Sequence, residues 1–160
     1  MFTAPLSKRL EPQRIEASGA LTIAGFSERY GADGPEKIPA QWARFAPHIG
    51  HIAGQKGNVT YGVCIGSEDS DRFQYLAGVE VSDATRVGKD LTVVTLPPRS
   101  YAVFFHGGHI STLHSFCVRI WSTWAQRTPA AKAPYFERYD ERFDPRTGNG
   151  GVEIWIPLAK

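Results

Sequence analysis

The segment IPAQWARFAPHI, residues 38–49, determines how the rest of the chain must be arranged. Its large apolar residues Ile38, Trp42, Phe45 and Ile49 are spaced i, i+4, i+7 and i+11, so they share one face of an α-helix. We predict a helix over residues 36–49, with Pro39 tolerated in its first turn. A helix with one apolar face has to pack that face against another layer of the domain.

A second helix with the same spacing is predicted in the C-terminal half of the chain. Its apolar residues are Leu113, Cys117, Ile120 and Trp124. Ser111 or Thr112 can cap this helix, which is expected to end near residue 125. Matching helices in the two halves of one chain indicate an internal repeat.

The strands predicted around the two helices follow the same order in each half. They cover residues 21–26, 61–65 and 73–81 in the first half, and residues 91–105, 135–142 and 152–158 in the second. A polar turn at residues 67–71 joins one hairpin, and Pro97-Pro98 interrupts the strand at residues 91–105.

We therefore predict a single α+β domain spanning residues 1–160. It consists of tandem β-α-β-β repeats, at about residues 14–82 and 91–158, related by pseudo-twofold symmetry. The repeats form an antiparallel sheet with two main helices, and a cleft between the halves is the natural ligand site.

Composition and charge exclude several classes of partner. The 160 residues carry a net charge of +2, and the charges are interspersed, which argues against nucleic acid or an anionic membrane. No helix-turn-helix motif, signal peptide or run of about 20 apolar residues is visible. Cys64 and Cys117 lie in apolar patterns, which indicates buried thiols in a reducing compartment. We expect a cytoplasmic protein that binds neither nucleic acid directly nor a membrane.

The last predicted strand, GVEIWIPL at residues 151–158, carries the sharpest candidate for a binding residue. Strand side chains alternate, so Glu153 and Trp155 share the face opposite the apolar residues. A carboxylate beside aromatic side chains can pair with a lipophilic cation that also lies over the rings. The alternative is an edge strand on which Glu153 lies in water.

Four more aromatic residues are candidates for the walls of that site: Tyr61, Tyr75, Trp121 and Phe136. Repeat position relates Tyr61 to Phe136, so we predict that one of them lines the same cavity as Trp155. Ordinary core packing is the alternative for each of the four. Trp42 and Trp124 lie on the apolar faces of the helices and are assigned to the core.

The three histidines His106, His109 and His114 have spacing that invites a metal-site interpretation. A turn that leads into a helix would scatter their side chains, so capping and surface roles are favoured. We expect no metal and no cofactor.

Five motifs together resemble the GyrI-like family, which is similar to the effector-binding domains of AraC-type and MerR-type multidrug-responsive regulators. They are IPAQWARF at residues 38–45, YGV at 61–63, HGG at 106–108, FERYD at 136–140 and VEIWIP at 152–157. The resemblance covers residues 14–158 and implies a tandem β-α-β-β fold. It also implies a hydrophobic, often cationic, ligand between the halves, with a glutamate on the last strand as its anchor. Glu153 matches that position.

Three functions stay open on this basis. The first is a stand-alone domain that binds or senses hydrophobic, cationic small molecules such as drugs, in line with a role in transcription regulation and with a possible homodimer. The second is a small hydrolase that uses Glu153 and a pocket tyrosine. The third is a gyrase-interacting protein. Since no Ser-His-Asp or Cys-His arrangement is visible, binding without catalysis is favoured.

Overall fold

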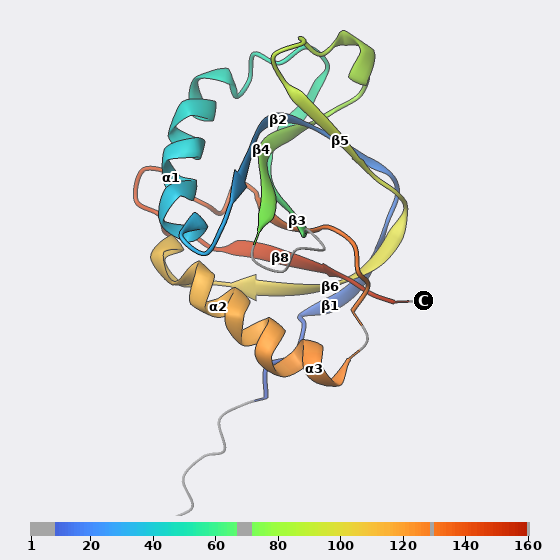
Figure 1. The fold of residues 1–160 in the computed structure, drawn as a ribbon, viewed down its shortest axis with the longest axis vertical. Helices are drawn as coiled ribbons and strands as arrows, with labels where there is room; N and C mark the ends of the chain where they lie inside the picture. The colour runs from blue at the N-terminus through green and yellow to red at the C-terminus, as the bar shows by residue number, and fades with distance from the viewer. Residues whose placement is uncertain (1–8, 67–71, 129, 160) are drawn as a thin grey trace, which may run out of the picture.

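The computed structural model describes residues 9–66, 72–128 and 130–159, and Figure 1 shows how their strands and helices are arranged. The first half contains β1 (Arg14–Ser18), β2 (Leu21–Tyr30), α1 (Gly34–Phe45), β3 (Gln55–Gly66) and β4 (Phe73–Val81). The second half contains β5 (Thr92–Leu96), β6 (Arg99–His106), α2 (Leu113–Arg119), α3 (Ala125–Arg127), β7 (Tyr135–Tyr139) and β8 (Val152–Pro157). A π-helical turn, Ile120–Trp124, joins α2 to α3.

The strands form one antiparallel sheet in the order β1-β6-β8-β7-β3-β4-β2-β5. The six central strands of this order are symmetric: β7 and β3 lie in the middle, β8 and β4 flank them, and β6 and β2 lie outside. Each of these halves has the order β-α-β-β along the chain. The predicted α+β fold with two main helices is therefore confirmed.

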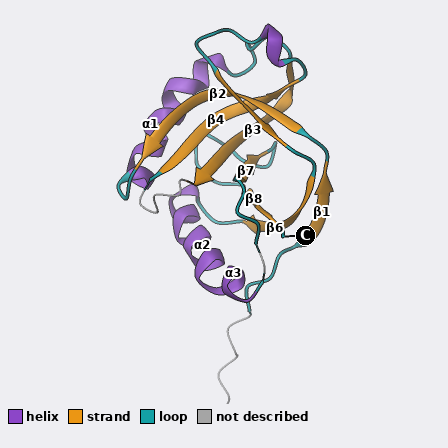
Figure 2. Cartoon of the chain, turned by 45° about the vertical axis from the view of Figure 1, so that its right-hand side comes forward, coloured by secondary structure: helices purple, strands orange, loops and turns teal. Residues whose placement is uncertain are grey.

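The two ends of the sheet are joined. β1 leads directly into β2, and β5 leads into β6 across Pro97-Pro98. β1 pairs with β6 and β2 pairs with β5 in one continuous register, from Arg14 opposite Val103 to Gly25 opposite Thr92. The sheet consequently curls into a barrel-like shape, which Figure 2 shows from a second side.

Apolar side chains pack in three clusters. One cluster contains only strand residues, such as Val63, Phe136 and Trp155, and fills the inside of the curled sheet. The other two lie on the outer face, one beneath α1 and one beneath α2. Burial of these surfaces supplies the main stabilisation of the fold. Among the described residues, no helix is long and apolar enough to cross a membrane.

Several boundaries differ from the predicted ones. β1 was not predicted, because its segment has the composition of a polar lead-in. It forms a strand by pairing with β6, which is a long-range contact. The helical residues Ala46–His48 after α1 form a 3-10 turn, since Pro47 cannot continue the backbone ladder of an α-helix. β7 ends at Tyr139 and not at residue 142. The predicted turn at residues 67–71 lies outside the described residues.

Candidate functional site

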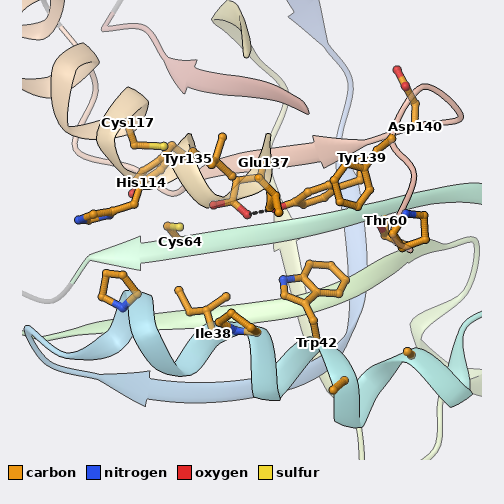
Figure 3. A pocket seen from close by; sticks show the side chains of 18 of the residues that line it. Ile38, Trp42, Thr60, Cys64, His114, Cys117, Tyr135, Glu137, Tyr139 and Asp140 are labelled. Carbon is orange, nitrogen blue, oxygen red and sulfur yellow. Dashed lines mark hydrogen bonds between the residues drawn. The ribbon is translucent and has the colours of Figure 1, made fainter. Parts of the chain in front are cut away.

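A pocket of about 760 Å³ lies between α1 and α2, over the outer faces of β3 and β7. Its size is within the range typical of small-molecule sites. Its lining includes Ile38, Pro39 and Trp42 of α1, Leu113, His114 and Cys117 of α2, and Thr60, Cys64, Tyr135, Glu137 and Tyr139 of the two strands. Both repeats thus contribute to it, as Figure 3 shows.

Glu137 is the acid at the centre of the pocket floor. On β7 the side chains alternate, so Tyr135, Glu137 and Tyr139 face the pocket, whereas Phe136 packs inside the sheet. The Oε1 atom of Glu137 accepts hydrogen bonds from the hydroxyls of Tyr75 and Tyr139, both at 2.7 Å. No described residue donates a hydrogen bond to Oε2, and no described cation forms a salt bridge with this carboxylate.

Burial raises the pKa of Glu137 above its ordinary value, while the hydrogen bonds from Tyr139 and Tyr75 oppose that shift. Glu137 is therefore half-buried, with a poorly hydrated carboxylate and no compensating positive charge among the described residues. Such a group favours either a proton or a bound cation. The pocket can supply aromatic contacts to that cation as well.

A chain of hydrogen bonds ties α1 to this acid. The indole Nε1 of Trp42 donates to the Tyr75 hydroxyl at 2.9 Å, and that hydroxyl donates to Glu137. One residue earlier, the fully buried Gln41 amide donates to the backbone carbonyls of Phe26 and Tyr75 and accepts from the Tyr30 hydroxyl. These bonds fix the helix, and with it the Trp42 ring, over the pocket.

Gly62 provides the space that the acid occupies. It lies directly opposite Glu137 in the β3–β7 register. A Cβ atom on Gly62 would overlap the Tyr75 hydroxyl and would lie 2.6 Å from Oε1 of Glu137.

We expect Gly62→Ala to displace Tyr75 or Glu137 and to lower the free energy of unfolding by about 2 kcal/mol, because the surrounding groups are packed and hydrogen-bonded. Urea unfolding measures this loss. Gly66→Ala on the same strand is the control, since no atom of the described residues lies within 4 Å of the place that its Cβ would take. Equal stability of the two variants would contradict the assigned role of Gly62.

Glu153 lies elsewhere than predicted. β8 is not an edge strand but pairs with β6 and β7, and Glu153 is 2% exposed. Its apolar neighbours Ile154 and Ile156 face α2, so Glu153 points away from the pocket. Both the predicted cleft position and the alternative of an acid in water disagree with this placement.

Three arginines surround Glu153. Its carboxylate lies 3.0 Å from Arg14, 3.6 Å from Arg138 and 3.2 Å from Arg142, and Trp155 donates its indole N–H at 3.0 Å. Burial acts to raise the pKa of Glu153, but the hydrogen bonds from Arg14 and Trp155 outweigh it and the pKa is lowered. The charge of Glu153 is therefore already neutralised within the protein.

The predicted wall residues lie mostly outside the pocket as well. The ring of Phe136 contacts both others: its centroid lies 5.6 Å from that of Tyr61 and 5.3 Å from that of Trp155. These contacts lie inside the curled sheet. Trp121 packs on Tyr135 from the α2 side. Tyr75 is fully buried and touches the site through its hydroxyl. Tyr135 lines the pocket, but none of the predicted wall residues does.

Other assignments are partly confirmed. Cys64 and Cys117 are free, buried thiols, as predicted. Trp124 belongs to the core, and Trp42 packs against two core clusters but also lines the pocket, which its assignment did not include.

The histidines have three different roles. His109 accepts a hydrogen bond from the backbone N–H of Ser111 and so caps the 3-10 turn Ile110–Thr112. Thr112 occupies the N-cap position of α2, one of the two predicted, but its side chain makes no capping hydrogen bond. His106 is buried and lies 3.0 Å from the Thr112 hydroxyl, whereas His114 lines the pocket. Among the described residues, no three His, Cys, Asp or Glu side chains are grouped to hold a metal ion.

The residues that sequence reasoning missed are Glu137, Tyr139, Trp42 and His114. A signal was present for the first two. Tyr135, Glu137 and Tyr139 alternate on one face of a strand, which is the pattern that drew attention to Glu153 and Trp155. For Trp42 and His114 no such signal was present in the sequence, because they line the pocket only through the way that α1 and α2 are placed.

The chain is similar to proteins of one known family. The family model described as GyrI-like small molecule binding domain matches residues 12–159. The transcriptional regulator BrlR of Pseudomonas aeruginosa is 33% identical over 149 residues, which are 91% of this chain and 54% of the regulator. The chain thus spans about half the length of that curated relative.

Solved structures share the fold. The structure of SAV2435 bound to tetraphenylphosphonium has a TM-score of 0.71 at 24% identity and covers 91% of this chain and 93% of its own. A transcription regulation protein from Staphylococcus aureus MU50 has a TM-score of 0.69 at 24% identity, covering 92% and 97%. An integron cassette protein of Vibrio cholerae has a TM-score of 0.64 at 17% identity, covering 94% and 98%.

Proposed function

This chain belongs to the GyrI-like family of small-molecule-binding domains, and from that premise we propose that it binds lipophilic organic cations, with Glu137 as the charged anchor. The observation that carries this proposal is a carboxylate with a raised pKa and no cationic partner among the described residues, at the centre of an aromatic pocket. A delocalised cation satisfies both features, because it needs little hydration and is attracted to ring faces.

The proposed binding residues differ from those expected from the sequence. Trp42, Tyr135 and Tyr139 provide the aromatic surface, and Tyr75 holds the acid in place through its hydroxyl. Glu153 and Trp155 are replaced in this role because the arginines already neutralise that acid. The tetraphenylphosphonium complex of a protein with the same fold supports the choice of ligand class.

Binding of tetraphenylphosphonium, measured by isothermal titration calorimetry, tests the proposal directly. We expect saturable binding of one cation per chain. A neutral triaryl analogue, triphenylphosphine oxide, should bind more weakly because it leaves Glu137 unpaired. Equal binding of the two compounds would contradict a charged anchor.

The affinity for a cation is expected to depend on pH. A carboxyl group with a raised pKa takes up its proton at a higher pH than an ordinary glutamate, whose value is 4.5. A cation competes with that proton, so its affinity should fall as the pH is lowered through the raised pKa of Glu137. Titrations from pH 8 to pH 5, within the range where the fold stays intact, measure this fall. Affinity that is constant over the range would contradict the proposed anchor.

A second candidate function is hydrolysis, favoured by one observation. Glu137, with its raised pKa, is hydrogen-bonded to two tyrosine hydroxyls, so a general base and proton donors are adjacent. This moves the role of general base in the hydrolase alternative from Glu153 to Glu137. Turnover of uncharged esters and strained-ring compounds that is lost in Glu137→Gln would favour this function.

Sensing is the biological use that the relatives suggest for such binding. The regulator from Pseudomonas aeruginosa contains a matching region within a protein of about twice the length. We propose that this chain responds to its ligand in a similar way as an effector-binding domain. A homodimer, a gyrase partner and a cytoplasmic location stay predictions.

A further inference from the structure

The pocket is built symmetrically in its backbone but not in its side chains. Gly62 and Glu137 pair directly across β3 and β7 and lie 75 positions apart in the chain. The same offset relates Phe45 of α1 to Ile120 of the π-helical turn that continues α2, and both are fully buried. Residues separated by this offset therefore occupy equivalent positions around the pseudo-twofold axis of the pocket.

Applied to the pocket lining, this offset pairs residues of very different size. Trp42 of α1 corresponds to Cys117 of α2, and Tyr139 of β7 corresponds to Cys64 of β3. Trp42 and Tyr139 pack against each other with ring centroids 5.4 Å apart. At the equivalent place on the other side of Glu137, two small thiols stand where the first side has an indole and a phenol.

The two ends of the pocket are consequently unlike. Figure 3 shows Trp42 and Tyr139 on one side of Glu137, and Cys64 and Cys117 on the other. Both thiols are buried and both have a raised pKa that keeps them uncharged, with burial as the main cause. Tyr135 and His114 lie on the same side of Glu137, so an aromatic ring and an imidazole border the space beside the thiols.

We propose that the cysteine end, between Cys64 and Cys117, is a subsite for an apolar aryl arm of the ligand, while the cationic centre lies at Glu137. The arm takes the place that the Trp42–Tyr139 pair fills on the other side. This inference rests on the proposed function and specifies its ligand class: a cation with at least one bulky apolar arm. A small cation without such an arm leaves the subsite empty and gains only the charge contact.

Filling the subsite tests this assignment. In Cys117→Phe, a ring enters the cysteine end from α2, and in Cys64→Leu, a smaller group enters it from the sheet. We expect either change to weaken tetraphenylphosphonium binding by about tenfold or more, because the arm and the new side chain compete for one space. The affinity for tetraethylammonium, which has no aryl arm, should change by less than about threefold.

The matched control is Val118→Phe. Val118 follows Cys117 on the same helix but is 50% exposed and does not line the pocket, so this variant should bind both cations as the wild type does. Circular dichroism and urea unfolding identify the variants that keep the fold. If Cys117→Phe does not fold, Cys64→Leu decides.

The outcomes separate the two proposals. If a folded filling variant binds tetraphenylphosphonium as tightly as the wild type does, the arm lies elsewhere and the subsite assignment is overturned. If both cations lose affinity equally, the added side chain acts on Glu137 and the assignment is overturned as well. If the wild type binds neither cation, the proposed function itself is wrong.

Discussion

Replacing Glu137 by glutamine is expected to weaken the binding of tetraphenylphosphonium by about ten- to a hundredfold, as for the loss of a partly buried ion pair. The amide has nearly the same size, and its Oε1 atom can still accept hydrogen bonds from Tyr75 and Tyr139. The aromatic surface of the pocket therefore remains. A neutral ligand of similar shape should lose much less affinity, so calorimetry with both ligands isolates the charge.

Glu141→Gln is the control for this experiment. It removes the same charge four residues further along the chain, at an exposed position outside the pocket lining. Long-range attraction between the protein and the cation changes equally in both variants. If Glu137→Gln loses no more affinity than Glu141→Gln, the cation is not bound by Glu137.

Glu137→Gln should not be less stable than the wild type. Because the pKa of Glu137 is raised in the folded protein, its ionised form is less favourable there than in the unfolded chain. Its contribution to stability is most favourable at a pH below its pKa in the unfolded chain. That contribution is lost as the pH rises through its higher pKa in the folded protein. Near neutral pH, the glutamine variant is therefore expected to be as stable or more stable, the pattern of a residue kept for binding.

The fold could be predicted because its helices and strands follow from short-range patterns in the sequence. The apolar spacing of Trp42 and Phe45, repeated at Cys117 and Ile120, indicates two helices, and the strands around them recur in the same order. The closure of the sheet was not predictable. It depends on the pairing of β1 with β6 and of β2 with β5, which brings together residues far apart in the sequence.

The location of the site was missed for a physical reason. Alternation along β8 shows that Glu153 lies on the opposite face of the strand from Ile154 and Ile156. It does not show which of these two faces borders a pocket. The helices settle this question: α2 covers the apolar face, so Glu153 must point inside the curled sheet. The same reasoning on β7 gives Glu137 to the helix side, where the space between α1 and α2 remains open.

Two acids with opposite environments result from this arrangement, the half-buried Glu137 and the buried Glu153. Glu137 has tyrosine hydroxyls as neighbours and a raised pKa, whereas Glu153 has arginines as neighbours and a lowered pKa. Environments that move two carboxyl groups in opposite directions commonly mark different roles. We assign ligand binding to the first and stabilisation of the fold to the second.

Glu153→Gln is therefore expected to lower the free energy of unfolding by about 3 kcal/mol, because three arginines lose their shared buried partner and their charges are left unbalanced. Partial exposure of those arginines limits the loss, since water can hydrate them. Urea unfolding at neutral pH measures the effect. Glu16→Gln, which removes an exposed partner of Arg14 alone, should cost less than about 1 kcal/mol.

The pH dependence of that loss follows from the lowered pKa of Glu153. Its contribution to stability is present above the value of the unfolded chain, near 4.5, and disappears as the pH falls through the lower value of the folded protein. The difference between wild type and Glu153→Gln should thus shrink on acidification below about pH 4. Tetraphenylphosphonium affinity should be retained in the folded variant at neutral pH. An unchanged stability combined with a lost affinity would instead return the role of anchor to Glu153.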